Sequence, residues 1–526
     1  MRRVFIVTSI VVTAALIFWA SYWPSALYFF ILVVPLILLG LFDILQTKRA
    51  IRRNYPLVGR LRYLLESIRP EIQQYFVESD TSGTPINRVD RSVIYQRAKK
   101  QIDTTPFGTQ LNVYAEGYEW MSHSVVPHDF HSMDHHPRIT VGGKDCKQPY
   151  QASVLNISAM SFGSLSGNAV EAMNAGAKIG GFAHNTGEGG ISPHHLKYGG
   201  DIIWQVGTGY FGARDENGKF SPEVYKKNAL RPEVKMIELK LSQGAKPGHG
   251  GILPAKKNTP EIAAIRSVKP GITIFSPPFH SAFSTPKQLI LFVKQLRDLS
   301  EGKPVGFKLC IGRKSEFISM CKAMVELDSY PDFITVDGGE GGTGAAPPEF
   351  SNFVGSPMMD GLAFVDNMLT GFGIRHHIKI VASGKVLTGF HMYRAFALGA
   401  DLCASARAMM MAVGCIQALQ CNSNKCPTGV ATQNQSLAKG LVVEDKKERV
   451  ANFHKNTVES FVELMAASGV DHPDKLNRHQ ITRRVFMNEV RTFEEIYPSI
   501  PAGSMLSAQV PHPYEHSYES ASADKF

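Results

Sequence analysis

The chain has 526 residues, of which 44% are hydrophobic and 46 are glycine, and this composition is typical of a globular α/β protein rather than a disordered one. Its formal net charge is +10, but no concentrated basic arm accompanies that charge, so nucleic acid is not an expected partner. The seven cysteines are an odd number and four of them are scattered, which argues against a secreted protein stapled by disulfides.

Two apolar runs open the sequence, over residues 4–20 and 26–41, and each is long enough, or nearly so, to cross a bilayer as a helix. Arg2 and Arg3 precede the first run and four basic residues follow the second, so both ends should face the cytoplasm. A cleaved signal peptide is the competing interpretation, but a second apolar run follows instead of a convincing cleavage site. We therefore predict a transmembrane helical hairpin over 1–48, which makes the chain a multi-pass membrane protein with its large domain in the cytoplasm and the lipid bilayer as a partner.

The composition and the spacing of apolar residues divide the rest of the chain into three segments. Residues 49–149 are charged and aromatic and are interpreted as a linker and packing extension. From about 150, short apolar runs end in glycine-rich loops and alternate with helical segments. The runs predict eight strands, over 154–158, 181–185, 202–206, 236–241, 305–310, 333–336, 378–382 and 401–404. Helices are expected between them, including 167–179, 286–299, 315–327 and 389–398. Eight strands alternating with helices indicate an α/β fold, a closed TIM-type (β/α)8 barrel over 150–470, and 471–526 form a C-terminal tail.

The active site of such a barrel lies at the C-terminal ends of the strands. Residues that could contact a ligand lie at the ends of most of the predicted strands. In chain order they are Met160, Ser161, Glu188, Lys240, Gln243, Lys246, Lys308, Asp337, Gly338, Gly339, Gly384, Ala404, Ser405 and Arg407. Taken alone, a glycine pair is an ordinary turn and a lysine can face solvent, so the recurrence at successive strand ends is what indicates a site. Loops after strands seven and eight commonly hold a phosphate, and a phosphate-bearing cofactor is therefore expected.

Three cysteines, Cys415, Cys421 and Cys426, lie in one window near the C-terminal end of the barrel. Thiolates this close in a cytosolic segment are better explained as iron–sulfur ligands than as a disulfide framework. They supply three ligands and no obvious fourth, which suits a cluster of three irons better than a structural zinc site; inert buried thiols are the alternative. His194 and His195 are adjacent but lack a third spaced ligand, so no metal site is expected there.

Four stretches, residues 185–190, 240–248, 337–344 and 415–433, closely resemble the FMN-binding synthase domain of glutamate synthases. More narrowly, the chain resembles stand-alone glutamate synthase-related proteins with a membrane-spanning N-terminus. The resemblance covers roughly residues 150 to 470. It implies a TIM-type barrel that carries FMN and a three-iron, four-sulfur (3Fe-4S) cluster.

The resemblance also implies a role for each matching residue. The three cysteines match the cluster ligands, and Lys308 matches a lysine beside the flavin ring. Flavin contacts are implied for Met160, Ser161, Lys308, Asp337, Gly338, Gly339, Gly384, Ala404, Ser405 and Arg407. Lys240, Gln243, Lys246 and Glu188 match groups around a 2-oxoglutarate site, where cations suit a substrate with two carboxylates. Lys308, Glu188 and Gln243 are the expected catalytic residues.

The implied reaction begins with an external electron donor, which is a ferredoxin, a reductase subunit or a membrane carrier. Electrons pass through the cluster to FMN, and a hydride from flavin N5 reduces 2-iminoglutarate, formed from 2-oxoglutarate and ammonia, to L-glutamate. The chain opens on an apolar run instead of the catalytic cysteine of a glutaminase, so ammonia is expected from solution or a separate partner.

Two alternative functions are kept open. The first is a membrane-associated FMN and iron–sulfur oxidoreductase that acts on another imine or carbonyl. The second is an electron-transfer subunit without turnover of its own. His249 stands where the large enzymes tend to have an acidic residue, and this departure leaves the exact substrate open.

Overall fold

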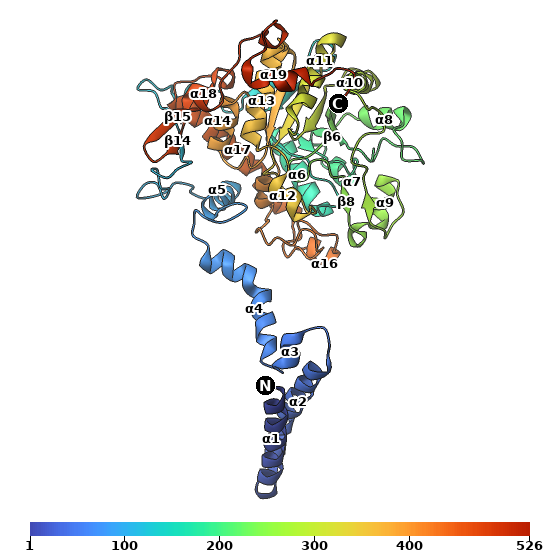
Figure 1. The fold of residues 1–526 in the computed structure, drawn as a ribbon, viewed down its shortest axis with the longest axis vertical. Coiled ribbons are helices and arrows are strands. Elements are labelled where there is room, and N and C mark those ends of the chain that lie inside the picture. Colours follow the sequence, from blue (N-terminus) through green and yellow to red (C-terminus); the bar gives the residue numbers. More distant parts are fainter. The chain divides into compact units, whose positions relative to one another are not determined.

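The computed structural model describes residues 1–526, which form two compact units, Met1–Pro85 and Ile86–Phe526. In the first unit, α1 (Arg2–Tyr22) and α2 (Phe30–Leu45) lie side by side and are joined by the 3-10 turn η1 (Pro24–Phe29). The two predicted apolar helices are therefore confirmed (Figure 1). The spans Arg2–Tyr22 and Pro24–Leu45 are long and apolar enough to cross a membrane, a property they share with N-terminal signal sequences. Two further helices, α3 (Ala50–Asn54) and α4 (Gly59–Ile72), complete the unit.

The second unit is built on a closed barrel of eight parallel strands, as predicted. The strands are β4 (Leu155–Ile157), β5 (His184–Asn185), β6 (Ile202–Val206), β7 (Val234–Lys240), β10 (Val305–Leu309), β11 (Phe333–Asp337), β12 (Lys379–Ser383) and β13 (Leu402–Ser405). Their order around the barrel follows the sequence, and pairing of Ala404 with Asn156 closes β13 onto β4. The strand predicted over 181–185 is the most shortened, because Gly181 caps the preceding helix with a φ of 64° and extended pairing begins only at His184.

Helices surround the barrel (Figure 1). They are α6 (Gly167–Gly180), α7 (Pro193–Leu196), α8 (Pro222–Ala229), α10 (Pro286–Leu299), α11 (Lys314–Leu327), α13 (Met358–Gly371), α14 (Gly389–Ala397), α15 (Arg407–Ala412) and α17 (Val443–Ala467). The four helices that the sequence predicts by range lie within one residue of their expected ends. Hydroxyl caps set three of these starts, because the side chains of Ser166, Thr285 and Thr388 accept hydrogen bonds from the backbone three residues on.

Two long strand-to-helix connections lie at the C-terminal ends of the strands. Residues 241–285, between β7 and α10, contain β8 (Ile252–Leu253), α9 (Pro260–Arg266) and β9 (Ile274–Phe275), and are called the β7–α10 excursion below. Residues 338–357, between β11 and α13, contain α12 (Pro348–Phe353) and are called the β11–α13 loop.

Smaller elements flank the barrel. In the extension before it, α5 (Arg88–Lys99) packs against α17, and β2 (Arg138–Val141) pairs with β3 (Tyr150–Ser153). A three-stranded sheet joins β1 (Glu119–Met121) to β14 (Ile481–Phe486) and β15 (Glu489–Thr492). The remaining helices are α16 (Gln435–Ala438), α18 (Phe493–Ile496) and α19 (Glu515–Glu519), of which α19 packs against α11.

A buried ion pair fixes the end of the barrel opposite the predicted site. Arg297 Nε lies 2.9 Å from Asp332 Oδ2, and their side chains are 2% and 1% exposed. Asp332 also accepts hydrogen bonds from the backbone of Gly143 and Val305, at 2.7 and 2.8 Å. One carboxylate thereby joins α10, the start of β10 and the β2–β3 connection.

Replacing Asp332 with alanine should remove the buried counter-charge of Arg297 and leave only the half-exposed Asp145, whose Oδ2 lies 3.8 Å from Nη1. The free energy of unfolding is expected to fall by about 3–5 kcal/mol. Thermal melting of the detergent-solubilised chain, followed by tryptophan fluorescence, measures this loss as a lower melting temperature. Asp524→Ala is the matched control, because that carboxylate is 74% exposed and its ion pair with Lys287 lies at the surface. Equal melting temperatures for the two variants would contradict the assigned role of Asp332.

Candidate active site

The centre of the site is an ion pair between neighbouring strands. Lys308 Nζ, at the end of β10, lies 3.2 Å from Asp337 Oδ2, at the end of β11, and both side chains are buried. Asp337 also accepts hydrogen bonds from the Gly244 N–H at 2.9 Å and from the Ser383 hydroxyl at 2.8 Å. Burial opposes the charge of Lys308, but Asp337 and Glu238 outweigh burial and raise its pKa, so the ammonium stays charged inside the barrel.

A second polar row crosses from the loop after β5 to the end of β7. Glu188 Oε2 lies 2.8 Å from Lys240 Nζ, which donates a hydrogen bond of 2.7 Å to Gln243 Oε1. Burial alone would raise the pKa of Glu188, but Lys240, followed by Arg266 and Lys246, brings it below its ordinary value. The predicted residues Glu188, Lys240 and Gln243 are thus brought into direct contact.

Lys246 lies in the β7–α10 excursion and is 3% exposed. Its ammonium donates to the Gly250 carbonyl at 3.2 Å, and burial lowers its pKa although Glu188 acts in the opposite direction. His249, whose Nδ1 lies 2.9 Å from the same carbonyl, packs edge-on against the ring of Phe350 at 5.2 Å. The excursion therefore holds Lys246 next to the Glu188 row and links His249 to the β11–α13 loop.

Arg266 is a candidate residue that the sequence does not reveal. It is the last residue of α9 and is 5% exposed; its guanidinium donates to the Phe162 carbonyl at 3.1 Å, and its Nε has no protein partner. Burial lowers its pKa to about 10, against the effect of Glu188. A buried guanidinium with an unused N–H beside a carboxylate row is suited to hold an anionic ligand.

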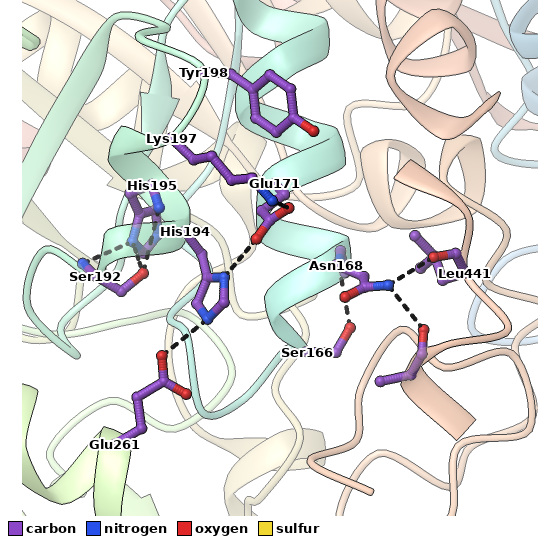
Figure 2. A network of polar contacts seen from close by, with 12 residues as sticks. Ser166, Asn168, Glu171, Ser192, His194, His195, Lys197, Tyr198, Glu261 and Leu441 are labelled. Atoms are coloured by element: carbon purple, nitrogen blue, oxygen red, sulfur yellow. Dashed lines mark hydrogen bonds and ion pairs between the residues drawn. The ribbon is translucent and has the colours of Figure 1, made fainter. Parts of the chain in front are cut away.

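Figure 2 shows how α9 is held in place. His194 Nδ1 lies 2.8 Å from Glu171 on α6, and its Nε2 lies 3.1 Å from Glu261 in the first turn of α9. His195 points elsewhere, and its Nδ1 contacts the hydroxyl of Ser192 at 2.8 Å. The two adjacent histidines therefore have structural partners, and no group of three or more His, Cys, Asp or Glu side chains in the chain is gathered closely enough to hold a single metal ion.

The loops after β4, β5, β11 and β12 approach one another so closely that side chains would not fit. A Cβ on Gly187 would lie 2.7 Å from the Ser161 nitrogen, next to Met160, and one on Gly338 would lie 2.5 Å from the Met358 nitrogen. Gly384 has a φ of 142°, which favours glycine. The other predicted glycine, Gly339, is equally confined by the Gly355 carbonyl at 2.9 Å.

Two cations lie at the ends of β12 and β13. Arg407 donates a hydrogen bond of 2.6 Å to the Glu340 carbonyl, and burial, followed by the charge of Arg407, lowers the pKa of Lys385. Neither cation forms an ion pair with a carboxylate, so the two positive charges remain available to an anion such as a phosphate. Of the other predicted residues here, Ser405 donates to the Val386 carbonyl at 2.6 Å and Ala404 lines the barrel interior. The residues present therefore fit a phosphate-bearing cofactor.

The barrel interior below these loops contains a cavity of about 20 Å³, which has room for one water molecule. Glu238 lines it and accepts hydrogen bonds from Asn185, Gln205 and Thr335, at 2.5 to 2.8 Å. Glu238 could have been found from the sequence. It lies two residues before Lys240 in a mostly apolar strand, and residues two apart in a strand face the same side.

The three cysteines lie together in the loop after α15. The Tyr95 hydroxyl donates to the Cys415 carbonyl at 2.7 Å, and the Gln417 side chain exchanges two hydrogen bonds of 3.2 Å with the Ile86 backbone. Segment 86–99 therefore holds the backbone of the cysteine loop.

The thiols are close enough to influence one another. Burial, with a further contribution from Cys421 and Cys426, raises the pKa of Cys415 to about 11. Burial would also raise the pKa of Cys426, but hydrogen bonds from Thr428 and from nearby backbone N–H groups lower it. The ammonium of Lys257, 4% exposed, lies near Cys421 and Cys426 and donates to the Ala431 carbonyl at 3.0 Å. Three neighbouring thiols are the type of donor set that iron–sulfur clusters use.

The cysteine loop also meets the β11–α13 loop. A Cβ on Gly344 would lie 3.6 Å from the Cβ of Cys421. The loop that begins at Asp337 therefore extends from the Lys308 ion pair to the cysteines, and it connects the two parts of the site through a single stretch of backbone.

Most of the chain matches proteins of one known family. Residues 107–471 match the family described as the conserved region in glutamate synthase. The chain is 38% identical over 496 residues to the glutamate synthase large subunit-like protein YerD of Bacillus subtilis, covering 86% of this chain and 94% of that protein. It is 36% identical over 337 residues to the archaeal glutamate synthase (NADPH) of Methanocaldococcus jannaschii, covering 63% of this chain and 62% of that relative. Among solved structures, a mandelate oxidase complex aligns with a TM-score of 0.43 and 14% identity, over 77% of this chain and 98% of that one.

The lowered pKa of Glu188 makes part of the folding stability dependent on pH. A carboxylate whose pKa is depressed by folding stabilises the folded state above its ordinary pKa of about 4.3, and that contribution is lost as the pH falls. Melting temperatures recorded from about pH 6 downwards should therefore fall less steeply for Glu188→Gln than for the natural chain. Lys240→Met should flatten the profile as well, because it removes the largest attraction on Glu188. If the melting temperatures of the natural chain and both variants fell equally steeply with pH, the Glu188–Lys240 ion pair would be ruled out as the source of this pH dependence.

Proposed function

We propose that this chain, which belongs to the glutamate synthase family, forms L-glutamate from 2-oxoglutarate and ammonia. It is an oxidoreductase of the glutamate synthase type. The observation that carries the choice of substrate is the arrangement of Lys240, Lys246 and Arg266 around Glu188, next to the Lys308–Asp337 pair. Three cations beside one carboxylate suit a substrate with two carboxylates, whereas an electron relay needs no such pocket.

The strand-end loops are proposed to hold FMN. Met160 and Ser161 would lie against the flavin ring, Lys308 would lie beside it, and Lys385 with Arg407 would receive the phosphate. The cysteine loop is proposed to hold a 3Fe-4S cluster through Cys415, Cys421 and Cys426, with electrons supplied by an external donor. When bound, the flavin would supply hydride transfer and the cluster would supply single-electron transfer.

The chain's own residues would bind and orient the substrate. Lys240, Lys246 and Arg266 would hold the carboxylates of 2-oxoglutarate through charge-assisted hydrogen bonds, which fixes its reacting carbon relative to the Lys308 end of the barrel. Gln243 would keep the Lys240 ammonium directed at the site through its hydrogen bond of 2.7 Å. The carboxylate of Glu188, whose Oε2 lies 2.8 Å from Lys240 Nζ, would accept an N–H of ammonium or of 2-iminoglutarate.

The first unit is proposed to anchor the protein in a membrane. Helices α1 and α2 would span the bilayer as a hairpin, and the basic residues at both ends would keep the barrel on the cytoplasmic side. Arg2, at the start of α1, donates a hydrogen bond of 2.9 Å to the Arg53 carbonyl, so the two basic ends lie together. This contact supports a hairpin in which both helix ends share one side.

Anaerobic purification in detergent, followed by spectroscopy and turnover, tests the proposal. Flavin absorption bands and an EPR signal of an oxidised three-iron cluster are expected. Addition of 2-oxoglutarate and ammonium to the photoreduced protein should reoxidise the flavin and produce glutamate. Both cofactors without reoxidation would overturn the substrate assignment, and assays with other oxo acids and ammonium would then test the alternative of another imine. A folded protein with neither cofactor would refute the whole proposal.

Lys308→Met removes the cation proposed to lie beside the flavin. Because a charge in a dry site is not replaced by solvent, we expect the rate of flavin reoxidation by 2-oxoglutarate and ammonium to fall about 10²–10³-fold, with a lower flavin potential. Lys303→Met is the matched control, since Lys303 is also a buried lysine but lies just before β10, where its ammonium donates to the carbonyls of Ala229 and Arg231. Unchanged rate and potential in Lys308→Met would remove its assigned role.

Cys426→Ala tests the proposed cluster without relying on turnover. Iron content and the three-iron EPR signal should be lost, because alanine supplies no ligand atom in place of the thiolate. Cys403→Ala is the control, since Cys403 is a buried cysteine of β13 outside the loop, and it should keep its iron. Full iron content in Cys426→Ala would show that this thiol is not a ligand.

A further inference from the structure

Helix α4, in the first unit, carries an exposed apolar face that nothing in this unit covers. At about 100° per residue, its large apolar side chains fall on one side of the helix. Their exposed fractions are 54% for Leu61, 57% for Leu64, 50% for Leu65, 40% for Ile68 and 38% for Ile72. Arg62, Ser67 and Arg69 lie outside this stripe and are also exposed. An apolar stripe of this kind indicates a partner for the helix.

The charge around α4 indicates the chemistry of that partner. Residues 46–77 contain seven Lys and Arg but only two Asp and Glu. The guanidinium groups of Arg49 and Arg52, at the start of α3, lie 4.4 and 4.8 Å from the ring centre of Tyr63 on α4, so α3 adds positive charge beside the helix. A basic amphipathic helix with a broad apolar face is the type of helix that lies on anionic lipid.

The position of α4 along the chain agrees with a lipid surface. Asp43, near the end of α2, is fully buried, and its two carboxylate oxygens each accept a hydrogen bond of 2.8 Å from Arg60 in the first turn of α4. The same carboxylate accepts the Leu57 N–H at 3.2 Å. The start of α4 is thereby fixed to the end of a candidate membrane span, which brings its apolar face within reach of the headgroups.

A second copy of the chain is the other partner that an apolar helix face can have, and three features disfavour it. The stripe includes Leu64 in addition to the residues at the seam spacing of a coiled coil, so it is wider than such a seam. Pro70 lies inside the helix, and a π-helical turn, Gln73–Val77, follows directly. Both interrupt the regular repeat that a coiled coil needs.

We propose that α4 lies in the headgroup region of an anionic membrane surface, with Leu61, Leu64, Leu65, Ile68 and Ile72 directed toward the acyl chains. This inference rests on the membrane anchoring proposed above. It adds a contact in the plane of the membrane to the spanning hairpin, and it makes the anchor sensitive to the charge of the lipids.

Photo-crosslinking of the full chain in vesicles of phosphatidylethanolamine and phosphatidylglycerol tests the inference. The photoreactive amino acid p-benzoylphenylalanine replaces one residue at a time: Leu64 on the apolar face, Glu66 on the opposite face as the matched control, and Ile10 within α1. Lipid adducts, identified by mass, are expected at Leu64 and Ile10 but not above background at Glu66. Vesicles of phosphatidylcholine alone should lower the yield at Leu64 and leave the yield at Ile10 unchanged.

The outcomes separate the two proposals. Adducts at Ile10 but not at Leu64 would overturn the surface helix and keep the spanning hairpin. Protein dimers crosslinked through Leu64 would overturn the lipid surface in favour of a second copy. Equal lipid yields at Leu64 and Glu66 would contradict a helix that lies with one face in the membrane. The absence of adducts at all three positions would refute membrane anchoring itself.

Discussion

The buried pair of Lys308 and Asp337 is the interaction on which the arrangement of the site depends. Two charges inside a barrel are tolerated only when they are paired and further hydrogen-bonded, and Asp337 meets this condition by binding the Gly244 N–H and the Ser383 hydroxyl as well. One carboxylate thereby joins the ends of β10, β11 and β12 with the loop after β7. The positions of the strand-end loops are therefore linked, and the polar groups on them converge on one place.

Most of the fold could be predicted from the sequence because parallel barrel strands are buried on both faces. Such strands read as short apolar runs, and the glycine-rich loops after them mark their ends. The prediction erred where a local signal competed, as at Gly181, which looks like the start of a strand but caps α6. The two apolar N-terminal helices were equally readable, because length and apolar composition alone define them.

The candidate site was predictable only where its residues follow strands. Glu188, Lys240 and Gln243 were found this way and lie in contact. Arg266 was not, because it lies at the end of α9, far along the β7–α10 excursion from the end of β7, where no periodicity relates a residue to the barrel. Its position depends on the contact of His194 with Glu261, two residues that are far apart in the sequence and carry no joint signal. Lys257 near the cysteines was missed for the same reason.

The hydrogen bonds between segment 86–99 and the cysteine loop determine when, during synthesis, this part of the structure can form. Tyr95 and Cys415, which one of these bonds joins, are 320 residues apart. During synthesis the apolar N-terminal helices leave the ribosome first, then α5, and the cysteines only after nearly the whole barrel. With the anchor and the cluster proposed above, iron would be delivered to a chain whose first unit already lies in the membrane. The contact between Tyr95 and Cys415 can therefore form only after all eight barrel strands have been synthesised.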